Sequence, residues 1–454
     1  MKEQKWTFCA ILAIIGIAAV ACDSGNGINN GNVTVSLDKN IMTLEVGITE
    51  TLVANVNPND TALLWTSSDE TKAVVNNNGR ITGISPGKVK ITVATVDGCQ
   101  TAECVVTVNS VYILGTNGYW VDGVKVDIDG ALLGLAVSEG KVYTSGYYRI
   151  GYPSDTYPDD GIYRKACYWL DGNRIDLPDE TGNSCATRMT VSNGKVYIAG
   201  WYNDGNYIRA CYWEDGQKVD LPVGTGNSMV TDITVINNIV YAVGCYGKLN
   251  IAGIIIDNGY VINCYWVNGT RYDLNFSPDS PIDYIGYPQN NISDYSRGFR
   301  LAVSDGKVYT SGNLYGRHPS GGYMMTQSKY YINRVSYHLA SGSSVSYVGG
   351  ITVSNNKVYV AGQFYLDWTS GVSRGTYSYA CYWIDQERIN LSLGEAISIA
   401  VSGNKTYISG MYKESRSNSE WKPCFWVNGE RRELVGGKGG RITHSSSGIV
   451  VVSE

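Results

Sequence analysis

Short runs in which hydrophobic and polar residues alternate cover most of the chain after residue 32. Residues 33–37, 51–56 and 89–95 show this pattern clearly. A period of two is typical of β-strands that bury one face. Turn-forming pairs such as Asp97-Gly98 and Asp171-Gly172 separate the runs. The pattern therefore predicts an all-β protein built from many short strands.

Residues 109–454 contain a repeat of about 40 to 50 residues. A typical copy combines a Val-Tyr-x-x-Gly element, an aromatic-Trp pair, an Asp-Gly or Asn-Gly turn and a short strand; the fifth copy has Tyr-Tyr in place of the aromatic-Trp pair, and the seventh has Thr406-Tyr407 in place of Val-Tyr. The aromatic pair recurs seven times, at Tyr119-Trp120, Tyr168-Trp169, Tyr212-Trp213, Tyr265-Trp266, Tyr330-Tyr331, Tyr382-Trp383 and Phe425-Trp426. Four strands per copy and seven copies predict a seven-bladed β-propeller.

The two ends of this repeat region are complementary. The first copy begins at its second strand, and residues 441–454 resemble a first strand. We therefore expect the C-terminal segment to complete the first blade, because ring closure protects the edges of the sheets. The repeat also resembles a bacterial extracellular repeat of the form aromatic-Trp-x-Asn/Asp-Gly, and this resemblance implies no reaction.

Residues 33–108 predict a separate, small β-sandwich, since short strands alternate with turns at Pro58-Asn59 and Pro86-Gly87. The segment is similar to the bacterial immunoglobulin-like group 2 domain in residues 44–47, in the stretch from Trp65 to Glu70, in residues 77–93 and in residues 104–108. This resemblance implies a cell-surface spacer or adhesive module. The predicted fold is thus an immunoglobulin-like β-sandwich followed by a seven-bladed β-propeller over residues 109–454.

The N-terminus has the pattern of an export signal. Lys2 and Lys5 precede an apolar run over residues 8–21, which is too short to span a bilayer. Residues 1–21 and the following Cys22 resemble a bacterial lipoprotein signal, and this resemblance implies that Cys22 is lipidated. Ordinary cleavage after Ala21 is the alternative. Residues 22–32 then form a flexible tether, and we expect a lipid-anchored envelope protein exposed at the outer surface.

Composition narrows the possible functions. The chain has 454 residues, a net charge of −5, 53 Gly, 35 Tyr and 3 His. The negative charge argues against nucleic-acid binding, and the scattered histidines argue against a histidine metal site. No known catalytic motif is present. We therefore expect no catalytic residues, no metal and no cofactor, although a carboxylate pair formed between two long loops is not excluded.

Several repeated residues have a structural interpretation. The Trp of each copy is expected to pack between blades rather than to stack on sugars. The Asp of each Asp-Gly pair is expected to form a hairpin turn rather than to act in catalysis. The five cysteines before the aromatic pairs occupy equivalent places in different blades, too far apart for disulfides; they are Cys167, Cys211, Cys264, Cys381 and Cys424. Cys99 and Cys104 are likewise too far apart to pair.

Loop lengths differ between the two faces of the predicted propeller. We expect three or four residues between the first and second strands and two between the third and fourth, whereas the other connections are long and variable. The long loops share one face, which in repeat proteins often binds ligands. Aromatic residues on this face are candidate ligand contacts, with packing against the propeller rim as the alternative. They are Tyr147, Tyr148, Tyr152, Tyr157, Tyr163, Tyr284, Tyr287, Tyr295, Tyr365 and Trp368.

These features favour a non-catalytic, adhesin-like surface protein. Its partners would be the membrane, through the lipid anchor, and an extracellular glycan or protein ligand. An extracellular polysaccharide-acting propeller enzyme and an envelope-assembly scaffold are the alternatives.

Overall fold

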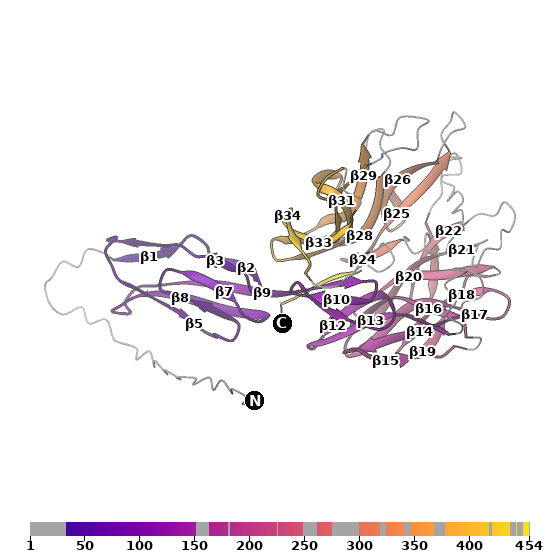
Figure 1. Ribbon diagram of the computed structural model, residues 1–454, viewed down its shortest axis with the longest axis horizontal. Helices are drawn as coiled ribbons and strands as arrows, with labels where there is room; N and C mark the ends of the chain where they lie inside the picture. Colours follow the sequence, from indigo (N-terminus) through magenta and orange to yellow (C-terminus); the bar gives the residue numbers. More distant parts are fainter. Residues whose placement is uncertain are drawn as a thin grey trace, which may run out of the picture. The chain divides into compact units, whose positions relative to one another are not determined.

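The regular elements of the computed structural model are strands throughout its described part (Figure 1). The described residues are 33–150, 163–179, 182–224, 226–247, 261–274, 299–317, 324–339, 346–366, 377–416, 420–435, 442 and 448–453. Within these ranges, no helix is long and apolar enough to cross a membrane. The chain divides into two compact units, with the boundary after Asn109.

The first unit is a β-sandwich around one apolar core. Its strands form three sheets: β1 (Thr34–Leu37) with β4 (Ala54–Asn57); β2 (Ile41–Glu45), β9 (Thr101–Gly115), β8 (Gly87–Thr95) and β5 (Leu63–Ser67); and β3 (Thr49–Thr51), β7 (Arg80–Gly83) and β6 (Ala73–Val75). Along β8 the side chains alternate between buried and exposed, as the period-two pattern requires. The buried positions of several strands meet at Leu44, Leu52, Ile81, Ile91 and Val106.

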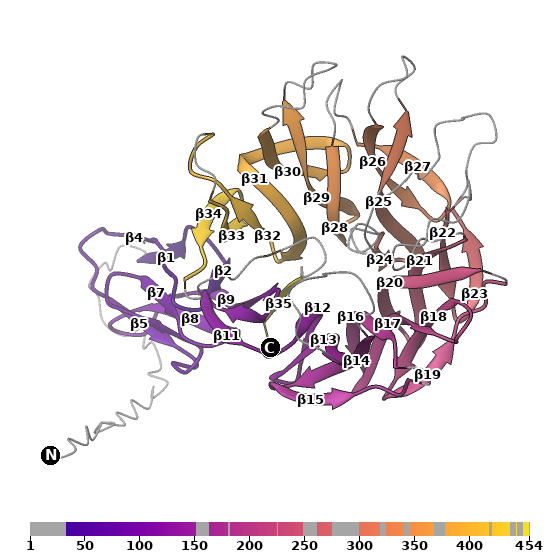
Figure 2. The same ribbon diagram turned by 45° about the vertical axis from the view of Figure 1, so that its right-hand side comes forward.

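The second unit is a seven-bladed β-propeller, as predicted. Each blade is a four-stranded antiparallel sheet, whose strands we call A to D in order from the propeller axis (Figure 2). Blade I consists of β35 (Ile449–Val452), β9, β10 (Gly118–Val121) and β11 (Val124–Asp127). Blade II consists of β12 (Ala131–Ser138), β13 (Lys141–Ile150), β14 (Tyr163–Leu170) and β15 (Asn173–Asp176).

The other five blades follow in chain order. Blade III is β16 (Ser184–Ser192), β17 (Lys195–Asn203), β18 (Ile208–Glu214) and β19 (Gln217–Asp220). Blade IV is β20 (Asn227–Ile236), β21 (Ile239–Gly247), β22 (Val261–Val267) and β23 (Thr270–Asp273). Blade V is β24 (Arg300–Ser304), β25 (Lys307–Arg317), β26 (Met324–Ile332) and β27 (Val335–His338). Blade VI is β28 (Ser346–Ser354), β29 (Lys357–Leu366), β30 (Tyr377–Ile384) and the first part of β31 (Glu387–Ser402). Blade VII is the second part of β31, β32 (Lys405–Tyr412), β33 (Lys422–Val427) and β34 (Glu430–Glu433).

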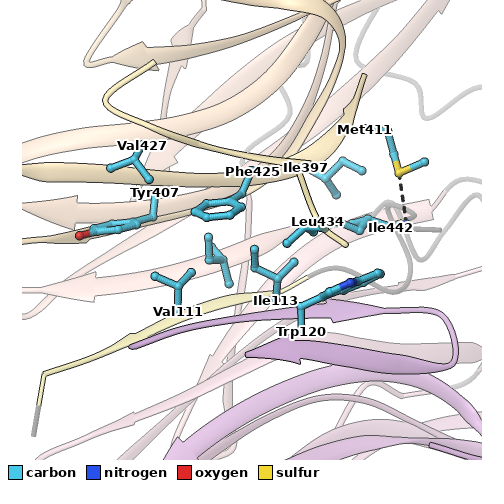
Figure 3. Packing of buried hydrophobic residues seen from close by; sticks show 11 residues of the cluster. Val111, Ile113, Trp120, Ile397, Tyr407, Met411, Phe425, Val427, Leu434 and Ile442 are labelled. Atoms are coloured by element: carbon cyan, nitrogen blue, oxygen red, sulfur yellow. Dashed lines mark hydrogen bonds between the residues drawn. The ribbon is translucent and has the colours of Figure 1, made fainter. Parts of the chain in front are cut away.

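The C-terminal strand closes the ring, which confirms the expectation from the repeat. Strand β35 pairs antiparallel with β9, from Ile449 opposite Ile113 to Val452 opposite Ser110. Beside it, Trp120 of blade I packs with Phe425 of blade VII and with Ile449 in one buried cluster (Figure 3). The two ends of the repeat region are therefore held together by a β-ladder and by apolar packing.

The aromatic pair forms the core between blades, as predicted. Trp213 of blade III packs against Tyr143 and Tyr168 of blade II, and Trp426 of blade VII packs against Tyr359 and Tyr382 of blade VI. In blade V, Tyr331 replaces the Trp and packs against Tyr241 and Tyr265 of blade IV. All of the strand-C tryptophans are buried. The strand-C aromatic residue therefore packs against the preceding blade in the same way at each of these interfaces.

The repeated Asp is a turn residue, which confirms the structural interpretation. Asp215 has a φ of 47°, and its Oδ1 accepts a hydrogen bond of 2.8 Å from the Val196 N–H at the start of strand B. The Asp215 N–H in turn donates to the Val196 carbonyl. In the other blades the equivalent backbone N–H donates in the same way to the side-chain oxygen of the turn residue, which is Asp122, Asp171, Asn268, Asn333, Asp385 or Asn428.

The turns between strands A and B are shorter than expected. They contain two residues rather than three or four, as at Asn193-Gly194 and Asp305-Gly306, and these residues have positive φ. Both short connections of a blade are therefore tight hairpins of the kind that favours Asn, Asp and Gly.

Replacing Asp215 by Ala should destabilise the propeller by about 1–3 kcal/mol. The substitution removes a hydrogen bond and leaves a β-carbon in the left-handed region. Asp215→Asn should cost much less, because Asn268 and Asn428 make the same bond in other blades. Equilibrium denaturation of the full chain measures both values, and an equal loss in the two variants would contradict this role.

The five strand-C cysteines are free thiols, as predicted, and Cys104 is also free. All are buried. Burial raises the pKa of the Cys167 thiol to about 12, and it also raises the pKa of Cys211 and Cys264. Cys99 is disulfide-bonded, but Cys104 is not its partner. The five strand-C thiols act as small apolar side chains in the blades.

Candidate functional site

Two of the aromatic candidates have side chains that the structure describes, Tyr147 and Tyr148 in strand β13. Tyr163 and Tyr365 lie in strands β14 and β29 instead of in loops, because these hairpins extend further than the repeat indicates. The remaining candidates fall outside the described residues; they are Cys22, Tyr152, Tyr157, Tyr284, Tyr287, Tyr295 and Trp368. Their roles stay predictions.

Tyr148 belongs to a contact that several blades repeat. The Arg174 guanidinium lies 4.0 Å from its ring centroid, and its hydroxyl donates to Asp176 Oδ2 at 3.2 Å. The same arrangement joins Tyr246, Arg271 and Asp273 in blade IV and Tyr412, Arg431 and Glu433 in blade VII. Because the contact recurs between strands B and D, it stabilises the blade in the same way wherever it occurs.

Tyr147 packs at the interface between blades II and III. Its half-buried ring joins a cluster with Trp201 and Met229, and the Arg164 guanidinium lies 4.9 Å from the ring centroid. In the described part of the chain, both tyrosines therefore contribute to packing within the propeller.

A different set of residues gathers at equivalent positions of the innermost strands, and we call it the axial ring. Each member is a residue of strand A. It pairs with the fourth residue of the Val-Tyr-x-x-Gly element on strand B, or it lies next to the position of that pair. For example, Gly134 pairs with Ser145 and Asp232 pairs with Val243. The axial ring consists, in blade order, of Gly448, Gly134, Arg188, Asp232, Arg300, Gly350 and Ser398. Figure 2 shows strands β35, β12, β16, β20, β24 and β28 around the centre of the propeller.

The composition of the axial ring is uneven. Three consecutive blades, III to V, contribute Arg188, Asp232 and Arg300, whereas the other four contribute Gly or Ser. Arg188 and Arg300 are 9% and 7% exposed, and Asp232 is half-buried. Charged side chains are rarely placed so deep in a protein unless they are paired or functional.

Asp232 is fixed in place by backbone donors from two blades. One oxygen accepts from the Ile233 N–H at 2.9 Å, and the other accepts from the Leu301 N–H of blade V at 3.0 Å. Neighbouring blades are also joined at this level by side-chain hydroxyls that donate to backbone carbonyls: Thr187 to Val230 and Thr231 to Phe299. The carboxylate thus has a preorganised position between two blades.

The charges of the axial ring interact with one another. Loss of solvation raises the pKa of the Asp232 carboxyl, and the positive charges of Arg188 and Arg300 oppose that rise. Burial lowers the pKa of the Arg188 guanidinium, and repulsion from Arg300 lowers it further. Burial also lowers the pKa of Arg300, against the attraction of Asp232. The three charges of the axial ring therefore influence one another.

A bulge accompanies the axial ring in the blades whose strand A is long enough to show it. The register with strand B shifts next to Gly134, Arg188, Asp232, Gly350 and Ser398. A β-bulge inserts an extra residue and turns a side chain out of the regular alternation. Five blades thus show one irregular position each, and in two of them the residue at this position is charged, Arg188 and Asp232.

The axial ring was not predicted from the sequence, although the sequence carries a signal for it. Aligned on strand A, the residue before the Leu-Ala-Val-Ser type run is Gly134 or Gly350 in two copies but Arg188, Asp232 or Arg300 in three. A charged residue at one strand position of a repeat breaks the binary pattern. Among the described residues, no group of three or more His, Cys, Asp or Glu side chains is placed to hold a metal ion.

Comparison with known families identifies the first unit. Residues 33–106 match the bacterial Ig-like domain (group 2), as their sequence suggested. Matches to whole proteins are short. An uncharacterized protein of Clostridium acetobutylicum is 41% identical over 87 residues, which is 18% of this chain and 21% of that protein. Lacto-N-biosidase of Bifidobacterium bifidum is 34% identical over 87 residues, which is 19% of this chain and 7% of that enzyme. The chain thus covers about a fifth or less of the length of these relatives.

Similar solved structures are propellers of low sequence identity. An ulvan lyase of polysaccharide lyase family PL25 aligns with 82% of this chain and 92% of its own, at 10% identity and a TM-score of 0.40. The β-propeller domain of the trilobed protease from Pyrococcus furiosus aligns with 83% and 92%, at 12% identity and a TM-score of 0.35. A glycoside hydrolase aligns with 59% of this chain and 93% of its own, at 9% identity and a TM-score of 0.31.

These comparisons correct one prediction. The absence of a known catalytic motif suggested that the chain is not an enzyme, but propellers similar to it include polysaccharide lyases.

Proposed function

We propose that the protein is a cell-envelope protein that acts on an extracellular polysaccharide, and that the polysaccharide is recognised at the axial ring of the propeller. The observation that carries this proposal is the axial ring, where Arg188, Asp232 and Arg300 replace the small residues of the other blades. Fold closure alone does not require these charges, because blades I, II, VI and VII close with Gly or Ser.

The position of the charges supports a ligand site. Asp232 and Ser398 of the axial ring are half-buried rather than buried, so solvent reaches part of the ring. Sugars are bound by polar side chains with fixed hydrogen-bonding groups, and Asp232 is held by two backbone N–H groups. The local similarity to a lacto-N-biosidase is in keeping with a polysaccharide as the ligand.

The remaining sequence features complete the proposal. Lipidation of Cys22 anchors the protein, residues 23–32 form the tether, and the Ig-like domain separates the propeller from the membrane. Tyr152, Tyr157 and Trp368, which lie outside the described residues, are proposed to contact sugar rings, since aromatic rings offer apolar area to the faces of sugars.

A polysaccharide panel tests this function. The full chain is incubated with neutral and acidic polysaccharides, binding is measured by affinity electrophoresis, and cleavage is measured as a fall in polymer length. We expect at least one polysaccharide to bind, and Arg300→Gln to weaken that binding at least tenfold. Arg174→Gln, which removes an equal charge between strands B and D of blade II, should have no effect. The absence of binding and cleavage across the panel would refute the proposal.

A further inference from the structure

An exposed aromatic ring lies on the face of the propeller that carries the connections between strands B and C. Among the side chains that the structure describes, Tyr207 and Tyr272 are the exposed aromatic residues, at 42% and 39%. Tyr272 belongs to strand D of blade IV, where its ring stacks on that of Tyr265 with 5.2 Å between centroids. Tyr207 lies between strands β17 and β18 of blade III, and its ring is outside the apolar clusters around that blade.

The side chain of Asp204 holds the loop that carries Tyr207. Its Oδ1 accepts the N–H groups of Asn206 and Tyr207 at 2.8 and 2.7 Å, and the Asp204 N–H donates to the Tyr207 carbonyl at 3.0 Å. Desolvation raises the pKa of the Asp204 carboxyl, but the hydrogen bonds that it accepts outweigh this effect and lower the pKa to about 2. The acceptor is therefore ionised at neutral pH, and the backbone at Tyr207 is fixed before a ligand binds.

Arg209 fixes the ring itself. Its guanidinium lies 5.0 Å from the centroid of the Tyr207 ring, a cation–π contact. The same guanidinium donates from Nε to Asp204 Oδ2 at 2.5 Å and from Nη1 to the Gly224 carbonyl at 3.2 Å. The cation is thus anchored on one side of the ring, and the rest of the ring is left to solvent. A ring that is already oriented loses little conformational entropy when a ligand binds to it.

The loop is joined to the strand that carries Asp232. The Ile208 N–H donates to Asn227 Oδ1 at 2.9 Å, and Asn227 is the first residue of strand β20. Asp232 of the axial ring lies further along the same strand, at about 16 Å for an extended chain. A polysaccharide that contacts the axial ring can therefore extend to Tyr207.

On the basis of the proposed function, we infer that Tyr207 stacks on one sugar ring of the polysaccharide. The C–H groups on the face of a sugar pack against an aromatic ring, whereas its hydroxyls need polar partners. The exposed Asn206 beside Tyr207 offers an amide, which both donates and accepts hydrogen bonds. Tyr207 and Asn206 thus recognise the uncharged ring of a sugar unit, and blade III supplies this contact in addition to its residue of the axial ring.

Single variants of the full chain test this inference, with affinity electrophoresis in a polysaccharide that binds the wild-type protein. We expect Tyr207→Ala to bind about tenfold more weakly, as for other aromatic contacts that dominate an interface. Tyr207→Phe keeps the ring and should bind like the wild-type protein. Tyr272→Ala is the matched control, because it removes a similarly exposed tyrosine from strand D of blade IV, and it should retain the affinity. Unchanged affinity of Tyr207→Ala, or an equal loss in Tyr272→Ala, would overturn the inference.

Thermal unfolding separates ligand contact from a structural role. Tyr207→Ala should melt like the wild-type protein, because the ring lies outside the apolar clusters around blade III. A lowered melting temperature with retained affinity would show that the ring only stabilises its loop. Asp204→Ala leaves Tyr207 in place but removes the acceptor that orients both the loop and Arg209. We expect this variant to bind more weakly than the wild-type protein, and retained affinity would contradict the positioning of the ring by Asp204.

The two proposals fail in different ways. If a polysaccharide binds and Arg300→Gln weakens that binding, but Tyr207→Ala does not, the stacking contact is wrong and the proposed function stands. If no polysaccharide binds to the wild-type protein, the proposed function is wrong, and the inference fails with it.

Discussion

Ending the chain at residue 447 is expected to abolish the cooperative unfolding transition of the propeller. The truncation removes strand β35, which is strand A of blade I and pairs with β9 over four residues. Ile449 is buried in the cluster of Trp120, Phe425 and Ile442, and burial of one such side chain stabilises by about 1.5–3 kcal/mol. Loss of the strand also exposes the inner edge of β9. The lost burial alone is a sizeable fraction of the whole stability of a typical domain, about 5–15 kcal/mol, and the lost strand pairing adds to it.

Differential scanning calorimetry of the full chain and of two truncations measures this effect. A chain that lacks only residues 453–454 retains β35 and should unfold like the intact protein. Ending the chain at residue 447 should also increase cleavage by proteases within blades I and VII. An unchanged propeller transition in the longer truncation would show that packing between the blades suffices without the closing strand.

Replacing Trp213 by Ala should destabilise the propeller by about 3–5 kcal/mol, as for other buried Trp side chains. The indole is fully buried between blades II and III, and its Nε1 donates to the Pro178 carbonyl at 3.3 Å. The substitution leaves a cavity next to Tyr143 and Tyr168 and an unpaired carbonyl. Equilibrium denaturation with guanidinium measures the change in the free energy of unfolding.

Trp213→Tyr is the matched variant. Blade V has Tyr331 at this position, buried against Tyr241 and Tyr265, so a tyrosine fits the interface geometry. We expect this variant to lose less than half as much stability as Trp213→Ala. Equal losses would show that the interface of blade III depends on the indole itself and does not share the packing of blade V.

The repeat made most of the fold predictable. A side chain that recurs at one position of every blade meets the same neighbours each time, and the repeat therefore predicts the structural roles of Trp213 and Asp215. Closure by residues 449–452 was predictable for the same reason, since the first copy lacks one strand.

The axial ring was less predictable because its residues deviate from the repeat. Arg188, Asp232 and Arg300 are distant in sequence, and only the register of strands β16, β20 and β24 brings them to equivalent positions. The extent of the hairpins was also hidden: Tyr163 and Tyr365 extend strands beyond the repeated motif. Sequence motifs describe neighbours along the chain, whereas this site depends on positions across blades.

One comparison tests the central claim most directly. The affinity of a polysaccharide that binds the full chain is measured at one ionic strength for the wild-type protein, for Arg300→Gln and for Arg174→Gln. Recognition at the axial ring predicts that Arg300→Gln binds at least tenfold more weakly and that Arg174→Gln binds as tightly as the wild-type protein. Equal affinity of Arg300→Gln and the wild-type protein would contradict the account.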